Sequence, residues 1–375
     1  MELKFRVAKI IQSQTTKNNK KPYFMPKETM TPRERWQAVL SRQTPDRVPM
    51  DYWGTPEVTE KLMKHFGCVS YHKLMKKLHV DYQVSAYPRY VGPPLPPTED
   101  VYGIRYKNFD YGTGTYDEAV YAPLAEYTSV DEVETNYRWP DPDWWDYSEI
   151  PKNIHGREDY PIRGGGSEPF LTYKYLRGDE QAMMDLVENP EIVEYCLGKL
   201  FDLAYENTQR IFEAIPGQVT MTYVAEDMGG QNDLMFSPRH IRRFLFPGMK
   251  RLIDLTHQAG ALVFHHNDGN CSRIIPDLID LGIDLLNPIQ WRAVGMERET
   301  LKQKYGSKIV FHGAMDNQYT LPFGTVDDIR QEVHDNLRIL GEGGGYILAP
   351  CHNIQPITPI ENILAMYEEG YAVGW

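Results

Sequence analysis

Residues 261–286 read ALVFHHNDGNCSRIIPDLIDLGIDLL. An apolar segment rich in β-formers, Ala261–Phe264, is followed by a polar turn and by an amphipathic helical stretch that ends at Leu281. A second apolar segment, Ile283–Leu286, comes directly after that helix. A strand, a helix and a strand in this order favour a parallel pair of strands in one sheet. This part of the chain therefore predicts an α/β fold.

The same alternation recurs along the chain. Five strand–helix units lie in the second half, and three more strand candidates lie upstream. The eight predicted strands are 48–52, 80–85, 161–165, 219–225, 261–264, 283–286, 309–311 and 346–349. Eight is the number that closes a (β/α)8 TIM barrel, which is the fold we predict. The alternative is an open doubly wound sheet, but no glycine-rich dinucleotide fingerprint follows the first strand.

The predicted domain organisation is one barrel with an extension and an insert. Residues 1–29 are polar and lysine-rich, and we interpret them as an N-terminal extension. Thr31 and Pro32 begin the first helix, because Thr is a favoured N-cap and Pro is favoured at the first helical position. The barrel spans residues 30–375 and carries an insert at about 98–150, where alternating polar and apolar residues around glycine turns predict an antiparallel hairpin.

Charge and cysteine content narrow the class of protein. The chain has 375 residues, with 40 Lys and Arg against 52 Asp and Glu, so its formal net charge is −12. That balance excludes a nucleic-acid binder that works by general phosphate neutralisation. No apolar run approaches the ~18 residues that a membrane helix needs, and the four cysteines form no CxxC pair. We expect a cytoplasmic protein without a nucleic-acid or membrane partner. A homodimer is a possible assembly for a barrel of this size.

Polar side chains at the predicted strand ends mark the candidate site, because reactive groups of such barrels lie at the C-terminal ends of strands. His266 and Asp268 follow the fifth strand and share one face, since side chains alternate along a strand. Both can bind one divalent ion, and His352, with Cys351 as runner-up, can complete a zinc site. The alternative is a hydrogen-bonded His–Asp pair that serves the structure or acid–base chemistry.

Five further residues at strand ends are candidates for other roles. Glu226 and Asp227 can act as a fourth ligand or a general acid, and Asp51 can donate a proton. Tyr52 and Gln290 are our candidates for contacts with a cofactor.

Several motifs together resemble the uroporphyrinogen decarboxylase superfamily, which also includes corrinoid-dependent methyltransferases. The motifs that carry the resemblance are Met30–Arg35, Asp46–Pro49, Ala225–Gly229, His266–Gly269, Ala349–Ile354 and Thr358–Asn362. The resemblance covers residues 30–375 and implies a (β/α)8 barrel.

The departures from the superfamily pattern point to one branch. The arginine-containing segment that binds substrate carboxylates in true uroporphyrinogen decarboxylases is replaced by residues 51–56, DYWGTP, which argues against that substrate. The zinc methyltransferases carry His-x-Cys-Gly and a second Cys, where this chain has His266-x-Asp268-Gly269 and His352. An Asp/His ligand set is harder than two thiolates and suits an oxygen substrate.

The resemblance therefore implies a demethylase-type methyltransferase that uses a metal, expected to be zinc. A small methylated, ether-type substrate would give its methyl group to a corrinoid carried by a partner protein. One rival is a uroporphyrinogen decarboxylase-like decarboxylase or lyase, with His352 and Asp51 as proton donors. A second rival is a non-catalytic module that binds a tetrapyrrole or corrinoid.

Overall fold

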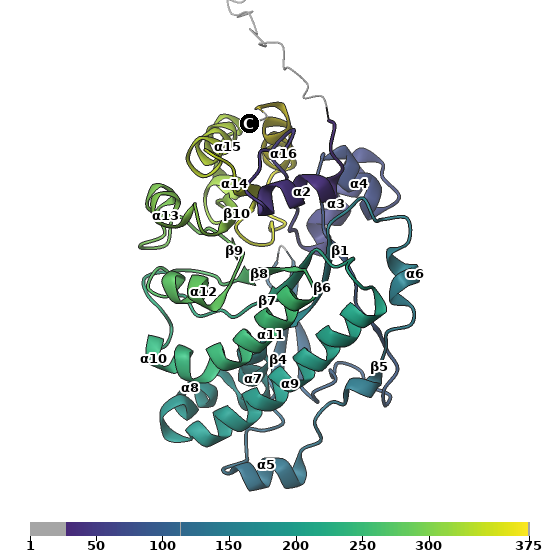
Figure 1. Ribbon diagram of the computed structural model, residues 1–375, viewed down its shortest axis with the longest axis vertical. Helices are drawn as coiled ribbons and strands as arrows, with labels where there is room; N and C mark the ends of the chain where they lie inside the picture. Colours follow the sequence, from purple (N-terminus) through teal and green to yellow (C-terminus); the bar gives the residue numbers. More distant parts are fainter. Residues whose placement is uncertain (1–27, 113, 374–375) are drawn as a thin grey trace, which may run out of the picture.

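The computed structural model describes residues 28–112 and 114–373. Its centre is a sheet of seven strands that all run parallel, and the helices lie around it (Figure 1). In sheet order the strands are β1 (Val84–Ser85), β6 (Ile162–Ser167), β7 (Met221–Val224), β8 (Leu262–His266), β9 (Leu285–Asn287), β10 (Val310–Met315) and β11 (Tyr346–Pro350). The predicted α/β class with a parallel sheet is confirmed.

The predicted closure of this sheet into a barrel, with residues 48–52 as one of the eight strands, is wrong. Residues 48–52 lie beside β11 but make only one parallel bridge there, between Met50 and Leu348. Pro49 has no N–H to donate, and the Met50 amide donates to the buried carboxylate of Asp81 at 3.1 Å. This amide faces residues 80–85, so a side chain takes the donor that a regular ladder on that side would need. The sheet is a curled, TIM-like half-barrel with an irregular segment in the eighth position.

The helices follow the predicted alternation. The first, α2 (Pro32–Leu40), begins with a capping box in which Thr31 and Glu34 satisfy each other's backbone amides. The others are α3 (Pro56–Phe66), α4 (Tyr71–Lys77), α5 (Val130–Asn136), η1 (Pro142–Trp144), α6 (Ile150–Ile154), α7 (Pro169–Arg177), α8 (Asp179–Glu188), α9 (Pro190–Ala214), α10 (Pro238–His240), the π-helical turn η2 (Ile241–Leu245), α11 (Phe246–Gln258), α12 (Ile275–Leu281), α13 (Arg298–Tyr305), α14 (Thr320–Phe323), α15 (Val326–Leu340) and α16 (Ile360–Val373). Within the described residues, no helix is both long and apolar enough to cross a membrane.

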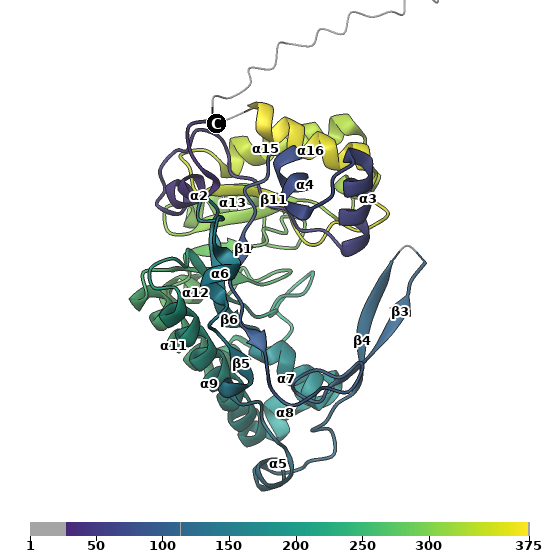
Figure 2. The same cartoon turned by 90° about the vertical axis from the view of Figure 1, so that its right-hand side faces the viewer.

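An antiparallel hairpin lies inside the predicted insert. Its strands are β3 (Arg105–Asp110) and β4 (Thr115–Tyr121), and a second short antiparallel pair joins β2 (Arg89–Tyr90) to β5 (Trp145–Asp146). Figure 2 shows the hairpin standing away from the helices, with its tip toward α3. There the Tyr111 hydroxyl donates to Gln355 at 3.2 Å. The predicted extension, residues 1–29, lies outside the described residues up to residue 27.

The interior of the half-barrel begins with an apolar layer. Inward-facing residues of five strands pack against Trp36, which lies on α2 and is completely buried. These strand residues are Met221, Phe264, Leu285, Val310 and Ile347. Because side chains alternate along a strand, the residues two positions further on face the same interior, one layer closer to the C-terminal strand ends.

Candidate functional site

The second interior layer is polar. Two positions beyond Phe264, Leu285 and Val310 stand His266, Asn287 and His312, and all three of these are buried. The strand register places them side by side, because His266 pairs with Asn287 and Leu285 pairs with Val310. Three polar side chains on a tightly packed apolar layer form the floor of the candidate site.

Two carboxylates converge with His266 at the end of β8. The Nε2 atom of His266 lies 3.7 Å from Oδ1 of Asp227 and 3.9 Å from Oδ1 of Asp268. One ligand atom from each of the three residues lies within 4.8 Å of the other two. The structure thus brings together two of the three predicted metal ligands and adds Asp227, which the sequence placed as a fourth ligand or general acid.

Backbone packing between two loops fixes the carboxylates. The Asp268 amide donates to Oδ1 of Asp227 at 2.9 Å, and the Asn270 amide donates to the Gly230 carbonyl at 2.7 Å. Gly269 has a φ of +74°, and a Cβ there would lie 2.6 Å from the Gly230 carbonyl oxygen. Only glycine permits both the backbone conformation and this close approach. The Asn-Asp-Gly sequence after β8 is therefore needed for the geometry of the site.

A hydrogen-bond chain sets the orientation of the His266 ring. Oδ1 of Asn287 lies 2.6 Å from Nδ1 of His266, and Nδ2 of the same asparagine lies 2.6 Å from Nδ1 of His312. An amide oxygen accepts, so neutral His266 carries its proton on Nδ1 and presents the lone pair of Nε2 to the carboxylates. His312 accepts at Nδ1 and donates from Nε2 to Asp51 at 3.1 Å. A metal-ligating histidine requires this arrangement of a second-layer partner.

The donor set fits a divalent cation such as zinc. It offers one imidazole nitrogen and carboxylate oxygens, all of which are ligands for zinc. Oδ1 of Asp268 is buried and has no hydrogen-bond donor among the described residues. Burial raises the pKa of Asp268, although the neighbouring His266 and His352 act in the opposite direction. A carboxylate oxygen with no donor, facing an imidazole lone pair, is stabilised by a cation between them.

The structure separates the two candidates for the remaining ligand. Nε2 of His352 lies 3.6 Å from Oδ2 of Asp268, and the His352 side chain is half-exposed. Cys351 is buried, and its Sγ donates to the Ile289 carbonyl at 3.3 Å. Burial raises the pKa of the Cys351 thiol well above its usual value, so the sulfur is protonated. Of the two residues, His352 lies beside the cluster, and Cys351 packs against the chain after β9.

The other predicted site residues lie around the cluster rather than in it. Glu226 is buried and accepts the Phe170 amide at 3.0 Å, and burial raises its pKa well above the usual value. Gln290 accepts the Gly269 amide and thus supports the loop that carries Asp268. The Tyr52 hydroxyl lies 3.0 Å from that of Thr59, and burial raises the pKa of Tyr52 to about 12.

Asp51 belongs to the wall of the site. Its Oδ2 accepts from Nε2 of Gln83 at 2.8 Å and from the Trp53 indole at 3.1 Å, besides His312. Its Oδ1 accepts the Tyr52 amide at 2.9 Å. Both oxygens of this buried carboxylate are therefore occupied by donors from the protein.

Sequence reasoning placed Asn287 and His312 at the ends of predicted strands six and seven, but it did not link them to His266, because that link depends on the register. It missed the aromatic residues that cover His266. The rings of Trp53 and Tyr223 both stack against the imidazole of His266, with centroids 5.5 and 5.8 Å from its own. No local pattern marks either aromatic residue as part of the site.

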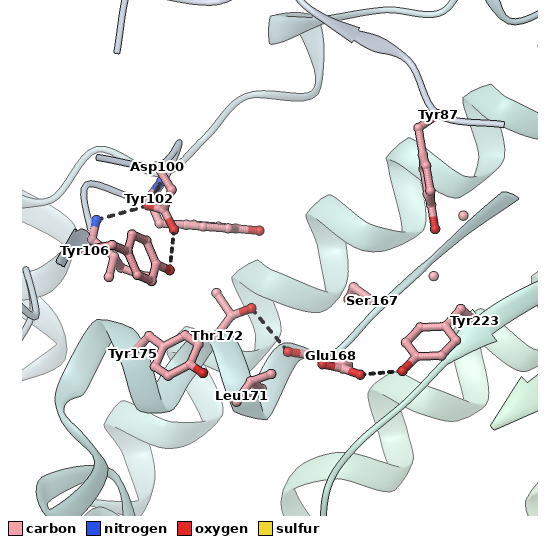
Figure 3. Close-up of a pocket in the computed structure, with 13 residues that line it drawn as sticks. Tyr87, Asp100, Tyr102, Tyr106, Ser167, Glu168, Leu171, Thr172, Tyr175 and Tyr223 are labelled. Carbon is pink, nitrogen blue, oxygen red and sulfur yellow. Dashed lines mark hydrogen bonds between the residues drawn. The ribbon is translucent and has the colours of Figure 1, made fainter. Parts of the chain in front are cut away.

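Two cavities lie beside the aromatic residues that cover His266. Both are lined by Tyr87 and Tyr223, and His266, Asp227 and Asp268 line neither. One has a volume of about 590 Å³ and is lined by Asp51, Trp53 and Arg163 among others. The second, about 350 Å³, is shown in Figure 3, where tyrosines surround Glu168. The Tyr223 hydroxyl donates to Glu168 at 2.8 Å, which fixes the ring between the two cavities. Substrate-sized space therefore lies directly beside the aromatic cover of His266.

Comparison with known proteins places this chain in a family. The sequence model for uroporphyrinogen decarboxylase (URO-D) matches residues 152–372, which is more than half of the chain, so the chain belongs to this family. It is 27% identical over 208 residues to the methylcobamide:CoM methyltransferase MtaA of Methanosarcina barkeri, a match that covers 56% of this chain and 57% of that protein. It is also 27% identical over 212 residues to the uroporphyrinogen decarboxylase of Solibacter usitatus, covering 56% and 54%. The chain thus spans about half the length of the curated relatives it matches.

A solved structure supports the fold over a longer range. A methyltransferase from Methanosarcina mazei superposes with a TM-score of 0.64 at 20% identity, covering 91% of this chain and 98% of the other. The likeness extends through the part of the chain that the family match leaves out. The resemblance inferred from the motifs, to the superfamily with its methyltransferase branch, is confirmed.

Proposed function

We propose that this protein is a metal-assisted methyltransferase that moves a methyl group from a small methylated, ether-type substrate to a corrinoid carried by a partner protein. The observation that carries the proposal is the convergence of His266, Asp227 and Asp268, with the Nε2 lone pair of His266 directed at two carboxylates. The similarity to MtaA, whose name describes methyl transfer from methylcobamide, supports the corrinoid partner.

The residues that would hold the zinc are His266, Asp227 and Asp268, with His352 beside them. A bound zinc supplies Lewis acidity toward the oxygen that loses the methyl group, and the partner's corrinoid supplies the methyl acceptor. Because the ligands are oxygen and nitrogen rather than thiolate sulfur, they donate less electron density to the ion and leave it more electrophilic.

The chain's own residues orient the site and exclude water from it. Asn287 and His312 select the tautomer of neutral His266 that has its proton on Nδ1, so Nε2 is the nitrogen available to a metal. Trp53 and Tyr223 stack near the same ring and also line the larger cavity, so a substrate in that cavity meets the aromatic side chains that cover His266. Removing water from such a site strengthens every electrostatic interaction within it.

A methyl-transfer assay tests the proposal. Zinc-loaded protein is incubated anaerobically with cob(I)alamin, which stands in for the partner, and with methanol, 2-methoxyphenol or 4-methoxybenzoate as donor. Cobalamin-dependent formation of the demethylated product is expected with the natural protein and not with His266→Ala. Binding of cobalamin without turnover of any of these donors would contradict the proposal and favour a non-catalytic module.

A decarboxylase or lyase remains the second candidate. The observation that favours it is the position of Asp268, whose raised pKa and contacts with His266 and His352 suit proton transfer. Release of CO2 from uroporphyrinogen by metal-free protein would establish this alternative. Residues 51–56 contain no arginine that could bind the carboxylates of that substrate, so we expect no such release.

A further inference from the structure

Arg163 is a half-buried arginine without a carboxylate partner. Its side chain lines the larger cavity, its guanidinium carbon lies 5.2 Å from the centre of the Tyr223 ring, and its Nε is buried without an acceptor. Among the described residues, nothing accepts a hydrogen bond from its guanidinium. The buried arginines elsewhere are paired: Arg35 and Arg47 with Asp81, and Arg177 with Asp185.

The carboxylate of Asp51, in the same cavity, forms no ion pair with Arg163. Both of its oxygens already accept hydrogen bonds, from His312, Gln83, Trp53 and the Tyr52 amide. The buried Nε of Arg163 is withdrawn from water with no acceptor, which is costly, and a carboxylate that enters the cavity repays that cost through charge-assisted hydrogen bonds to the guanidinium.

The surroundings restrict the kind of anion. Aromatic side chains line the cavity around Arg163, among them Tyr71, Tyr82 and Tyr223. Across Tyr223, the second cavity contains Glu168, whose negative charge disfavours an anion on that side (Figure 3). One guanidinium beside flat aromatic rings suits a single carboxylate on a flat apolar body better than a phosphate dianion, which needs more donors.

We propose that Arg163 binds a carboxylate group of the substrate, so that the substrate is a small methylated organic acid with a flat apolar body. Tyr223 lies between Arg163 and His266, and therefore the carboxylate end would lie one ring layer away from the methyl-bearing end. This inference deepens the proposed function and rests on it for the methyl-bearing end, whereas the binding of the carboxylate can be measured without metal or turnover.

The test is the binding of benzoate to metal-free full-length protein by titration calorimetry. Benzamide, which is neutral and of the same shape, is the matched ligand, and Arg239→Gln is the matched variant, because Arg239 is exposed on α10 and lines neither cavity. We expect benzoate to bind more tightly than benzamide, and Arg163→Gln to weaken benzoate binding about tenfold to a hundredfold. Arg163→Gln should leave benzamide binding unchanged, and Arg239→Gln should leave both unchanged.

Three results would overturn the inference: equal binding of benzoate to the natural protein and Arg163→Gln, no preference for benzoate over benzamide, or tighter binding of inorganic phosphate than of benzoate. Where Arg163→Gln does not fold, the salt dependence of the natural protein decides. Benzoate affinity must fall with rising ionic strength while benzamide affinity does not. Failure of methyl transfer in the cobalamin assay leaves this binding result unaffected, so the two proposals fail separately.

Discussion

Replacing Asn287 by leucine removes the side chain that joins His266 to His312. The change nearly preserves volume but leaves Nδ1 of both buried histidines without a partner. Each unsatisfied buried polar group costs about 1–3 kcal/mol, so we expect Asn287→Leu to lower the free energy of unfolding by about 2–6 kcal/mol. Loss of a second-layer partner of a metal-binding histidine typically costs about tenfold to a hundredfold in affinity, and we expect a zinc affinity reduced by that factor.

Two variants separate positioning of His266 from general destabilisation. Asn287→Asp keeps an acceptor for His266 and should retain most of the zinc affinity. Asn336 is also completely buried, and its Nδ2 donates to the Ala314 carbonyl at 2.9 Å, so Asn336→Leu should cost similar stability without changing zinc affinity. Urea unfolding measures the stability, and competition with a chelator measures the affinity. A folded Asn287→Leu protein with unchanged zinc affinity would refute the argument about the tautomer.

Three further changes have definite expected outcomes. Burial opposes the ionisation of Asp46, but hydrogen bonds from Arg35 and from two backbone amides hold its pKa at about 2, below its ordinary 3.8. Its carboxylate therefore contributes about 2 kcal/mol to the free energy of unfolding above pH 4, and this contribution is lost as the pH falls toward 2. In urea unfolding across this range, the free energy of unfolding of Asp46→Asn should decline less steeply than that of the natural protein. An identical decline in both proteins would contradict the ion pair. His266→Ala should abolish zinc binding in an equilibrium dialysis, whereas Cys351→Ser should leave it intact, and the reverse order would show that the sulfur is the ligand. Trp36→Ala should lower the free energy of unfolding by about 3–5 kcal/mol, and a loss below about 1 kcal/mol would show that the apolar layer beneath the site is not tightly packed.

The repeated strand–helix units could be predicted because their signal is local. The predicted strand 261–264 corresponds to β8, Leu262–His266, and the helix after it corresponds to α12, Ile275–Leu281. The failure of residues 48–52 to form a regular strand could not be predicted in the same way. Residues 48–52 are apolar enough for a strand, but the Asp81 carboxylate takes the Met50 amide, and this contact joins segments that are 31 residues apart.

The site shows the same division between local and distant information. The alternation of side chains along a strand placed His266 and Asp268 on one side, where the structure brings them together. The role of Asn287 depends on the register between three strands, which no single segment determines. The donors that surround Asp51, and the absence of an ion pair between Asp51 and Arg163, are visible only in the folded chain.

The X-ray absorption spectrum of the zinc-loaded protein tests the central claim most directly, because it reports the atoms bound to the metal. Zinc bonds to nitrogen and oxygen are about 2.0–2.2 Å long, whereas zinc–sulfur bonds are about 2.3 Å. With His266, Asp227 and Asp268 as ligands, we predict a first shell of nitrogen and oxygen alone. A zinc–sulfur distance in that spectrum would place Cys351 on the metal, and an absence of bound zinc after loading would remove the metal from the mechanism.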